Sequence, residues 1–429
     1  MYFLNVRFKF KIPSITPPIP GSVIAASAIS SIDLQKRKLT QYPHLNRRLL
    51  DPQLYMSSID PAIDSDTVAK LSAYPWFHGQ SVPKYDSGQY SNRTAWKQQH
   101  KSTLVSNWTR TVPTQLKAIQ KAAFAAVDFQ IKLGCEGIVL AGPLTTMADQ
   151  SLQSEVAWIE AGLDACEQLK VSVPVYATIA LSEEVLQVPA LKNPLVHGLS
   201  NQVSARGALA GAYIAFEQFD AGSYVWNSKD ALLSLLIMVD DLYRGAGKHA
   251  IVNYLGSFGA VAKAAGAEVW STGYYLTQRR FSRKAKIGRA RPRYYSLPLA
   301  GDIGLEEDLG KIRDAGIMND YLTPTAADDV LRTALKKGKS PADVPEWEYS
   351  MNNTAAAQQH YMEVASQTGS ALEGMPLKER RKWVHDWLKR AVQLANTLKA
   401  KHLIGMATDV NHQQVWLDVF EEWQSYAKQ

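Results

Sequence analysis

Polar residues follow several short apolar runs of this chain, where reactive side chains of an α/β protein would lie. Asp51 directly follows Leu49-Leu50, and His197 and Asn227 each end a further apolar run. In parallel barrels the reacting groups sit at the C-terminal ends of strands. A carboxylate there can act as a base or a nucleophile, so Asp51 is a candidate catalytic residue, and His197 could orient a substrate. Alternatively, an Asp before a proline caps a turn, and a lone histidine is structural.

A glycine-containing turn follows the apolar run Ile251–Leu255. Gly256, Ser257 and Gly259 stand before an expected short helix, where backbone N–H groups can bind an anion. An ordinary strand-to-helix turn would have the same pattern. Together with polar residues near expected strand ends, the turn predicts a substrate-binding set: Asn227, Asn253, Gly256, Ser257, Gly259 and Tyr274.

The positive charge of the chain is concentrated in one loop. The formal net charge is +7, and it would be −1 without eight cations that contain no acid among them: Arg279, Arg280, Arg283, Lys284, Lys286, Arg289, Arg291 and Arg293. Arginines bind phosphate through two parallel hydrogen bonds, and aromatic rings such as Phe281 can stack on exposed bases. The loop therefore predicts nucleic acid or a nucleotide as the partner. Ion pairs with acids such as Glu306–Asp308, or a membrane surface, are the alternatives.

No motif of the chain predicts a metal or a bound cofactor. Only two cysteines are present, Cys135 and Cys166, which is too few for a cysteine zinc site or a disulfide framework. HExxH, GxSxG and Walker-type loops are absent from the sequence. We therefore expect no metal and no cofactor, although a flavin or another phosphate-bearing cofactor held at Gly256 is a further alternative.

Apolar strands alternate with amphipathic helices between Leu49 and Leu299, which is typical of a parallel sheet. Expected strands include Leu49-Leu50, 138–141, Val173–Ile179, Asn193–Leu199, 223–226, His249–Leu255 and Glu268–Trp270. Expected helices include 115–133, 151–169, Ala205–Phe219, 228–244 and 258–265. About seven strands over this length favour a TIM-like parallel (β/α) barrel, with an open doubly wound sheet as the alternative.

The predicted domain organisation has three parts. Residues 1–45 read as an irregular, proline-rich lead-in, and residues 46–300 as the barrel, with an aromatic-rich loop at 74–112. Residues 301–429 carry helical periodicity without clear strands, so we expect a helical C-terminal region.

The stretch Ile251–Lys284 is similar to a segment of the tRNA-guanine transglycosylases. It combines a strand, a glycine turn, a short helix, Gly-Ala-Glu-Val-Trp, and Leu-Thr-Gln-Arg-Arg. The resemblance implies a parallel barrel that exchanges a base in nucleic acid, with Gly256 and Gly259 in the base-binding turn. Ser271 stands where that family has its nucleophilic Asp, which makes Ser271 a candidate catalytic residue, and the zinc-binding cysteines of the family are missing.

The leading functional prediction is a barrel protein that acts on or binds nucleic acid or a nucleotide through loop 279–293. One alternative is a non-catalytic nucleic-acid-binding or scaffold module, in which protein partners are expected. No uncharged apolar run reaches the ~20 residues that span a bilayer, and prolines interrupt the first apolar stretch, so neither an anchor nor a signal peptide is expected. The low cysteine content favours a cytoplasmic location.

Overall fold

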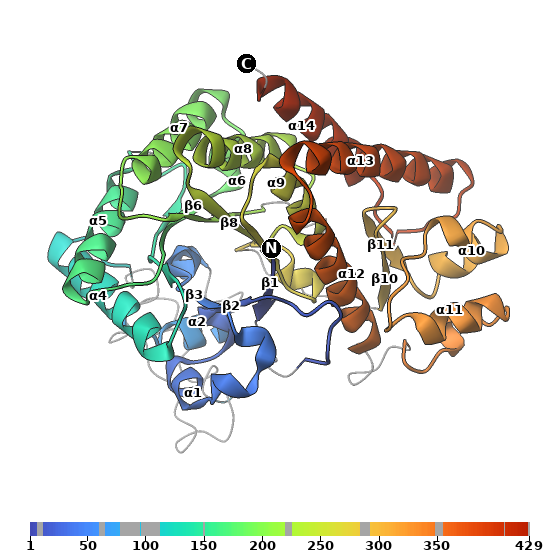
Figure 1. Cartoon of the computed structure of the whole chain (residues 1–429), viewed down its shortest axis with the longest axis horizontal. Coiled ribbons are helices and arrows are strands. Elements are labelled where there is room, and N and C mark those ends of the chain that lie inside the picture. Colours follow the sequence, from blue (N-terminus) through green and yellow to red (C-terminus); the bar gives the residue numbers. More distant parts are fainter. Residues whose placement is uncertain are drawn as a thin grey trace.

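A computed structural model describes residues 1–6, 12–59, 65–77, 95, 112–148, 151–218, 225–283, 292–347, 355–406 and 408–427. Parallel strands form a nearly closed barrel that helices surround, and a mainly helical C-terminal region packs on one side of it (Figure 1). The predicted TIM-like α/β barrel is therefore confirmed, and the open doubly wound sheet is excluded.

Eight strands, all paired in parallel, make up the barrel in the order β3-β2-β1-β9-β8-β7-β6-β4. Their bounds are β1 Tyr2–Val6, β2 Ser22–Ala25, β3 Arg48–Asp51, β4 Ile138–Val139, β6 Val175–Leu181, β7 Gly211–Phe216, β8 His249–Asn253 and β9 Val269–Thr272. A short strand, β5 (Leu144–Thr145), adds to β6. The two ends of the sheet meet where the N–H of Glu136 donates to the carbonyl of Arg48 at 3.1 Å.

The barrel helices are α1 Ser31–Lys36, α2 Ser65–Leu71, α4 Leu116–Leu133, α5 Gln153–Gln168, α6 Glu183–Leu186, α7 Pro189–Ser204, α8 Lys229–Asp240 and α9 Gly259–Ala265. Helix α4 ends where its sequence predicts, because Gly134 adopts a left-handed conformation at the C-cap. Since helices cover the outer face and side chains fill the inner face, residues on both faces of β1, β2 and β7 are buried.

The C-terminal region combines a two-stranded antiparallel ribbon with five helices among the described residues. These elements are β10 Arg293–Ser296, β11 Gly301–Gly304, α10 Asp308–Asp314, α11 Asp329–Lys336, α12 Ala355–Glu373, α13 Leu377–Ala400 and α14 His412–Tyr426. Helices α13 and α14 pack on α9 and α8 of the barrel, whereas α10 and α11 lie far from it (Figure 1). No helix within the described ranges has the length and apolar character needed to cross a membrane.

The predicted irregular lead-in over residues 1–45 is wrong, because two barrel strands lie in it. β1 occupies the centre of the sheet between β2 and β9, and all five of its residues are buried. β2 pairs with both β1 and β3. Each strand has only four or five residues, and prolines separate them, so neither produces a sustained period in the sequence.

Two element predictions between residues 193 and 226 are also wrong, and a third, the strand expected at 223–226, falls partly outside the described residues. Asn193–Leu199 lies inside helix α7, and Ala205–Phe219, predicted as a helix, contains strand β7. Trp226 lies outside any strand, while 219–224 fall outside the described residues. Small residues such as Ala212 and Ala215 resemble a helix in composition, but here they fit the crowded barrel wall. Most of the aromatic-rich loop at 74–112 also falls outside the described residues.

Gly259 illustrates how tightly the barrel and its helices pack. A Cβ atom at this position would lie 2.3 Å from the indole of Trp270 on β9, so only glycine lets α9 approach the strand. We expect Gly259→Ala to lower the free energy of unfolding by about 1–3 kcal/mol through overpacking. Chemical denaturation would measure the loss, with Gly207→Ala as the control, because a Cβ at Gly207 meets no atom within 4 Å. Equal effects of the two substitutions would contradict this packing role.

Candidate active site

The register of the strands turns a set of polar side chains toward the barrel interior. Residues paired in register on parallel strands share a face. Thr178 pairs with Tyr213 and Asn253 with Ser271, while Asp51 pairs with Ala25 at the end of β3. Barrel interiors are usually filled by branched apolar side chains. Polar residues from several strands near their C-terminal ends therefore mark this interior as a candidate active site.

Asp51 is the centre of this polar interior and is completely buried. Its Oδ2 accepts hydrogen bonds from the phenols of Tyr55 at 2.5 Å, Tyr213 at 2.8 Å and Tyr254 at 3.1 Å. Its Oδ1 accepts from the backbone N–H of Gln53 at 3.1 Å. We call Asp51 and these three tyrosines the Asp51 centre. Three phenols on one carboxylate oxygen form a short path along which a proton can move.

A second layer of amides orients the phenols. Gln53 Nε2 donates to the Tyr254 hydroxyl at 2.7 Å, and Asn253 Nδ2 donates to the Tyr213 hydroxyl. Because each of these hydroxyls accepts a hydrogen bond from an amide, its own proton points toward Asp51. Asn5 Nδ2 in turn donates to Asn253 Oδ1 at 3.2 Å. The hydrogen-bonded network thus extends from β1 across to β3.

Two residues of this network adopt left-handed backbone conformations. Gln53 has φ 53° and Tyr254 has φ 63°. Such conformations cost free energy in residues other than glycine, about 1–3 kcal/mol each, and they concentrate at functional sites. The side chains of the two residues are hydrogen-bonded to each other. Both left-handed backbone conformations therefore hold the same hydrogen bond of the network in place.

The environment raises the pKa of Asp51 to about 6. Burial is the largest cause, because it disfavours the charged form, and the hydrogen bonds from the phenols and from Gln53 oppose it by stabilising the carboxylate. A carboxyl group with this pKa changes its protonation near neutral pH, which suits general acid–base catalysis.

A buried ion pair lies beside the Asp51 centre, at the end of β7. Glu217 is 1% exposed, and both of its carboxylate oxygens accept from the Arg283 guanidinium, Oε1 at 2.7 Å and Oε2 at 2.8 Å. Arg283 also reaches Glu184 at 3.1 Å. Phe281 forms a bridge with Glu217, and its ring lies 4.8 Å from the ring of Tyr55 and 6.2 Å from that of Tyr254. This segment therefore covers the Asp51 centre and excludes water from it.

Some buried polar atoms beside the centre have no hydrogen-bond partner among the described residues. These are Asn5 Oδ1, Ser271 Oγ, and both the nitrogen and the oxygen of the Gln278 amide. The Gln278 side chain lies against Gly273, where a Cβ would meet its Oε1 at 2.4 Å, and Gly273 directly follows the end of β9, the strand that carries Ser271. Unpaired buried polar atoms cost about 1–3 kcal/mol each, so this side of the barrel is suited to a polar ligand.

Of the three predicted catalytic residues, the structure places two inside the barrel. Asp51 forms its centre, and Ser271 is buried beside Asn253, with which it pairs on the neighbouring strand. His197 is different, because it lies on helix α7 at the outside of the barrel. Its Nδ1 lies 2.8 Å from Asp241 Oδ2, and its side chain is 42% exposed. The prediction of His197 at the site fails because the strand expected at Asn193–Leu199 is a helix.

The predicted substrate-binding residues divide between several places. Asn253 belongs to the hydrogen-bonded network, whereas Gly259 serves packing against Trp270. Gly256 and Ser257 border a separate pocket between the barrel and the C-terminal region. Tyr274 is buried next to Tyr275, with ring centroids 4.7 Å apart, and Asn227 is half-buried before α8. The structure therefore does not bring these residues together into one site.

Of the described arginines of the basic loop, Arg280 is buried, and Arg279 and Arg283 are half-buried in ion pairs. Arg279 pairs with Asp302 at 2.8 Å and stacks on Tyr361, Arg283 pairs with Glu217, and Arg280 is 5% exposed. The acids that pair with Arg279 and Arg283, Asp302 and Glu217, approach them in space, and the role of these arginines as nucleic-acid contacts stays a prediction. Arg293 is half-buried in β10, and Lys284, Lys286, Arg289 and Arg291 lie outside the described residues.

The residues that the sequence did not reveal are three tyrosines, two amides and one acid. Tyr213 and Glu217 were hidden because β7 resembles a helix in composition, and Asn5 because β1 is short. Tyr55, Tyr254 and Gln53 follow strand ends without any motif. The alternation Tyr213-Ala215-Glu217 is a signal that could have identified an inward-facing strand.

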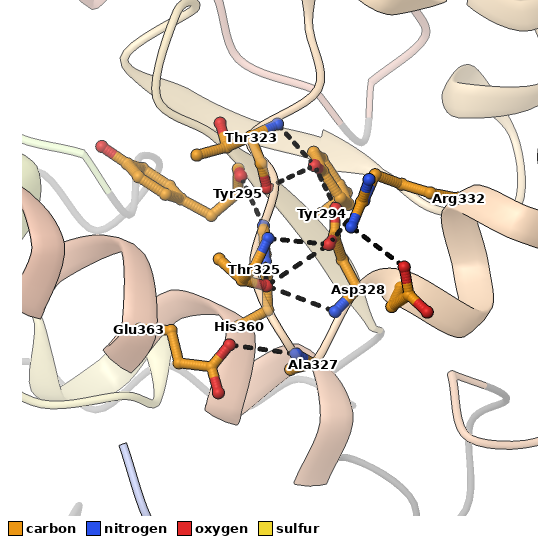
Figure 2. A network of polar contacts seen from close by, with 10 residues as sticks. Tyr294, Tyr295, Thr323, Thr325, Ala327, Asp328, Arg332, His360 and Glu363 are labelled. Atoms are coloured by element: carbon orange, nitrogen blue, oxygen red, sulfur yellow. Dashed lines mark hydrogen bonds and ion pairs between the residues drawn. The ribbon is translucent and has the colours of Figure 1, made fainter. Parts of the chain in front are cut away.

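A second buried polar network lies in the C-terminal region (Figure 2). Asp328 accepts from Tyr294 at 2.9 Å and from Arg332 at 2.8 Å, while His360 contacts Thr325 through Nδ1 and the Tyr295 carbonyl through Nε2, both at 2.8 Å. Burial lowers the pKa of His360, which keeps the ring neutral. Because both ring nitrogens are occupied, this network serves to join β10 to α11 and α12. Among the described residues, no group of three His, Cys, Asp or Glu side chains is placed to hold a metal ion.

Comparison with known proteins adds little to this site. No protein-family model and no curated protein matches the chain. Among solved structures, the chain is similar to a chain of the methanol:cobalamin methyltransferase complex MtaBC from Methanosarcina barkeri, with 9% identity and a TM-score of 0.31. The match covers 72% of this chain and 81% of that chain. A likeness this distant carries no argument about activity, so the resemblance to tRNA-guanine transglycosylases stays a prediction.

Proposed function

We propose that the barrel is an enzyme in which Asp51 acts as a general base on an uncharged polar substrate. One observation carries this proposal: a fully buried carboxylate faces three phenols at the C-terminal ends of the barrel strands. Barrel enzymes hold their reacting groups at this end. Above about pH 6 the carboxylate is ionised and can accept a proton, either directly or through a phenol that donates to it.

The groups beside Asp51 support an uncharged substrate. Asn5 Oδ1, Ser271 Oγ and both atoms of the Gln278 amide have no hydrogen-bond partner within the described part of the chain, and all three side chains are uncharged. Such a lining offers both donors and acceptors, which matches a compound that carries both, such as an amide or the edge of a nucleobase. A nucleobase agrees with the predicted resemblance to transglycosylases, although Ser271 replaces the nucleophilic Asp of that family and leaves the exchange reaction without its nucleophile.

The alternative of a non-catalytic nucleic-acid-binding module has less support. It depends on the basic loop, in which Arg279 and Arg283 form ion pairs with Asp302 and Glu217 of the same protein. A scaffold protein would also gain nothing from the buried Asp51 carboxylate or from the left-handed backbone conformations of Gln53 and Tyr254. Nucleic acid therefore remains a proposal.

A compound screen would test the proposed function. The wild-type protein and Asp51→Asn would each be incubated with free bases, nucleosides, oligonucleotides and small amides, and the mixtures analysed by mass spectrometry. We expect at least one compound to be consumed by the wild type and spared by the variant. If both proteins leave all compounds unchanged, or consume the same ones equally, the proposed role of Asp51 is wrong.

A further inference from the structure

A groove of about 360 Å³ lies on the outer surface of the barrel between α4 and α5. The two helices lie on the opposite side of the barrel from α10 and α11 (Figure 1). Ala161 and Ala165 of α5 form the floor of the groove and are buried, whereas Phe124 of α4 stands at its edge, 37% exposed. Because the floor residues carry only methyl groups, the groove has room for a large side chain.

Apolar side chains form an exposed row along α4 beside this groove. Leu116, Phe124 and Ile131 are all exposed. At about 100° per residue, the three side chains point within about 80° of one another, so they share one face of the helix. Exposed apolar side chains gathered on one face of a helix are typical of an interaction surface.

Charges of opposite sign flank the groove, one sign on each helix. Lys117 and Lys121 are exposed on α4, and Asp164 and Glu167 are exposed on α5. Lys121 and Asp164 both line the groove, and within the described ranges neither takes part in an ion pair. The surface of α4 and α5 therefore carries a positive wall and a negative wall beside its apolar row.

We propose that the surface formed by α4 and α5 binds a second copy of this chain across a two-fold axis. In such an interface both copies use the same surface, which must be complementary to itself. Phe124 of each copy would enter the groove of the other, and Lys121 of each would face Asp164 of the other. A partner with a single sign of charge would match one wall and repel the other, whereas a second copy matches both.

The size of the surface sets the strength of the expected contact. Helix α4 has 18 residues and is about 27 Å long, and two adjacent helices present a width of about 20 Å. The two copies together would bury about 1,000 Å², which is near the lower limit of a specific interface. We therefore expect a reversible equilibrium between monomer and dimer, with a dissociation constant in the micromolar range. The groove lies on the outer helices, so the proposal does not depend on the function proposed for Asp51.

Analytical ultracentrifugation of the full-length protein, from about 1 to about 100 µM, tests whether this surface associates. We expect the mass of the wild type to rise from that of a monomer to that of a dimer. Phe124→Glu should weaken association at least about tenfold, because it places a charge in the apolar contact. Val330→Glu is the matched control, since Val330 is an exposed apolar residue on the distant helix α11, and it should leave association unchanged.

Two charge variants test the two-fold arrangement itself. Lys121→Glu and Asp164→Lys each place like charges opposite one another in a dimer, so each variant alone should associate at least about tenfold more weakly. In an equimolar mixture, the heterodimer has opposite charges at both contacts, and association should return to the wild-type level. A wild type that stays monomeric up to about 100 µM, association unchanged by Phe124→Glu, or a mixture as weak as each variant alone would each overturn the proposal.

Discussion

Replacing Asp51 with asparagine is expected to lower the turnover of the barrel by about 100- to 10,000-fold, the range over which general acid–base groups contribute. Asparagine has nearly the same shape, but its amide cannot accept a proton at neutral pH. The measurement is the rate of consumption of a compound identified by the screen. Circular dichroism should show that the variant remains folded, since three phenols can still donate to the amide oxygen.

The pH dependence of the same reaction provides a signature of Asp51. As a base, Asp51 must be ionised, so wild-type turnover should rise with pH through about 6 and level off above it. Asp320→Asn is the control, because Asp320 is 52% exposed and lies in the C-terminal region. Full activity of Asp51→Asn would show that the hydrogen bonds of Asp51 serve the structure of the barrel interior and not a proton transfer.

Replacing Arg283 with alanine is expected to lower the free energy of unfolding by about 3–5 kcal/mol, the cost of breaking a buried ion pair from one side. Glu217 would lose two hydrogen bonds from the guanidinium while staying enclosed, since its side chain is 2% exposed. Denaturation with urea would measure the change.

A surface pair offers the comparison for Arg283. Arg390 and Asp320 are 2.8 Å apart, and each is 52% exposed, so solvent screens their attraction. Arg390→Ala should therefore change the free energy of unfolding by at most about 1 kcal/mol. If Arg283→Ala and Arg390→Ala lower the free energy of unfolding equally, the pair of Arg283 with Glu217 does not stabilise the protein as a buried ion pair does.

The barrel could be predicted from the sequence because its later elements are strongly periodic and clearly terminated. The helix ended by Gly134 and the strands at Val175–Leu181 and His249–Asn253 are examples. The first two strands could not, since β1 and β2 have five and four residues and take their stability from neighbours that are distant in sequence. These two strands form because they pair with neighbouring strands of the barrel, and the strand propensity of their own residues is not sufficient to predict them.

The candidate site could be predicted only in part, for a related reason. Asp51 was identifiable because a carboxylate ended an apolar strand. Tyr213 lies on β7, whereas Tyr55 and Tyr254 follow the ends of β3 and β8, and only the closed sheet brings the three phenols together. In the basic loop, the run of like charges along the chain gave no indication of the acids Glu217 and Asp302, which approach Arg283 and Arg279 only in space.

The most direct test of the account is the protonation of Asp51 in the folded protein. Carboxyl-¹³C aspartate labelling and NMR, with Asp51→Asn to assign the signal, would follow the titration. The account predicts a midpoint at about pH 6, and a higher one in Tyr213→Phe, because the Tyr213 phenol stabilises the carboxylate. Tyr243→Phe, at an exposed tyrosine, should leave it unchanged. A midpoint near the ordinary aspartate value of about 4 would contradict the proton-accepting centre on which the proposed function rests.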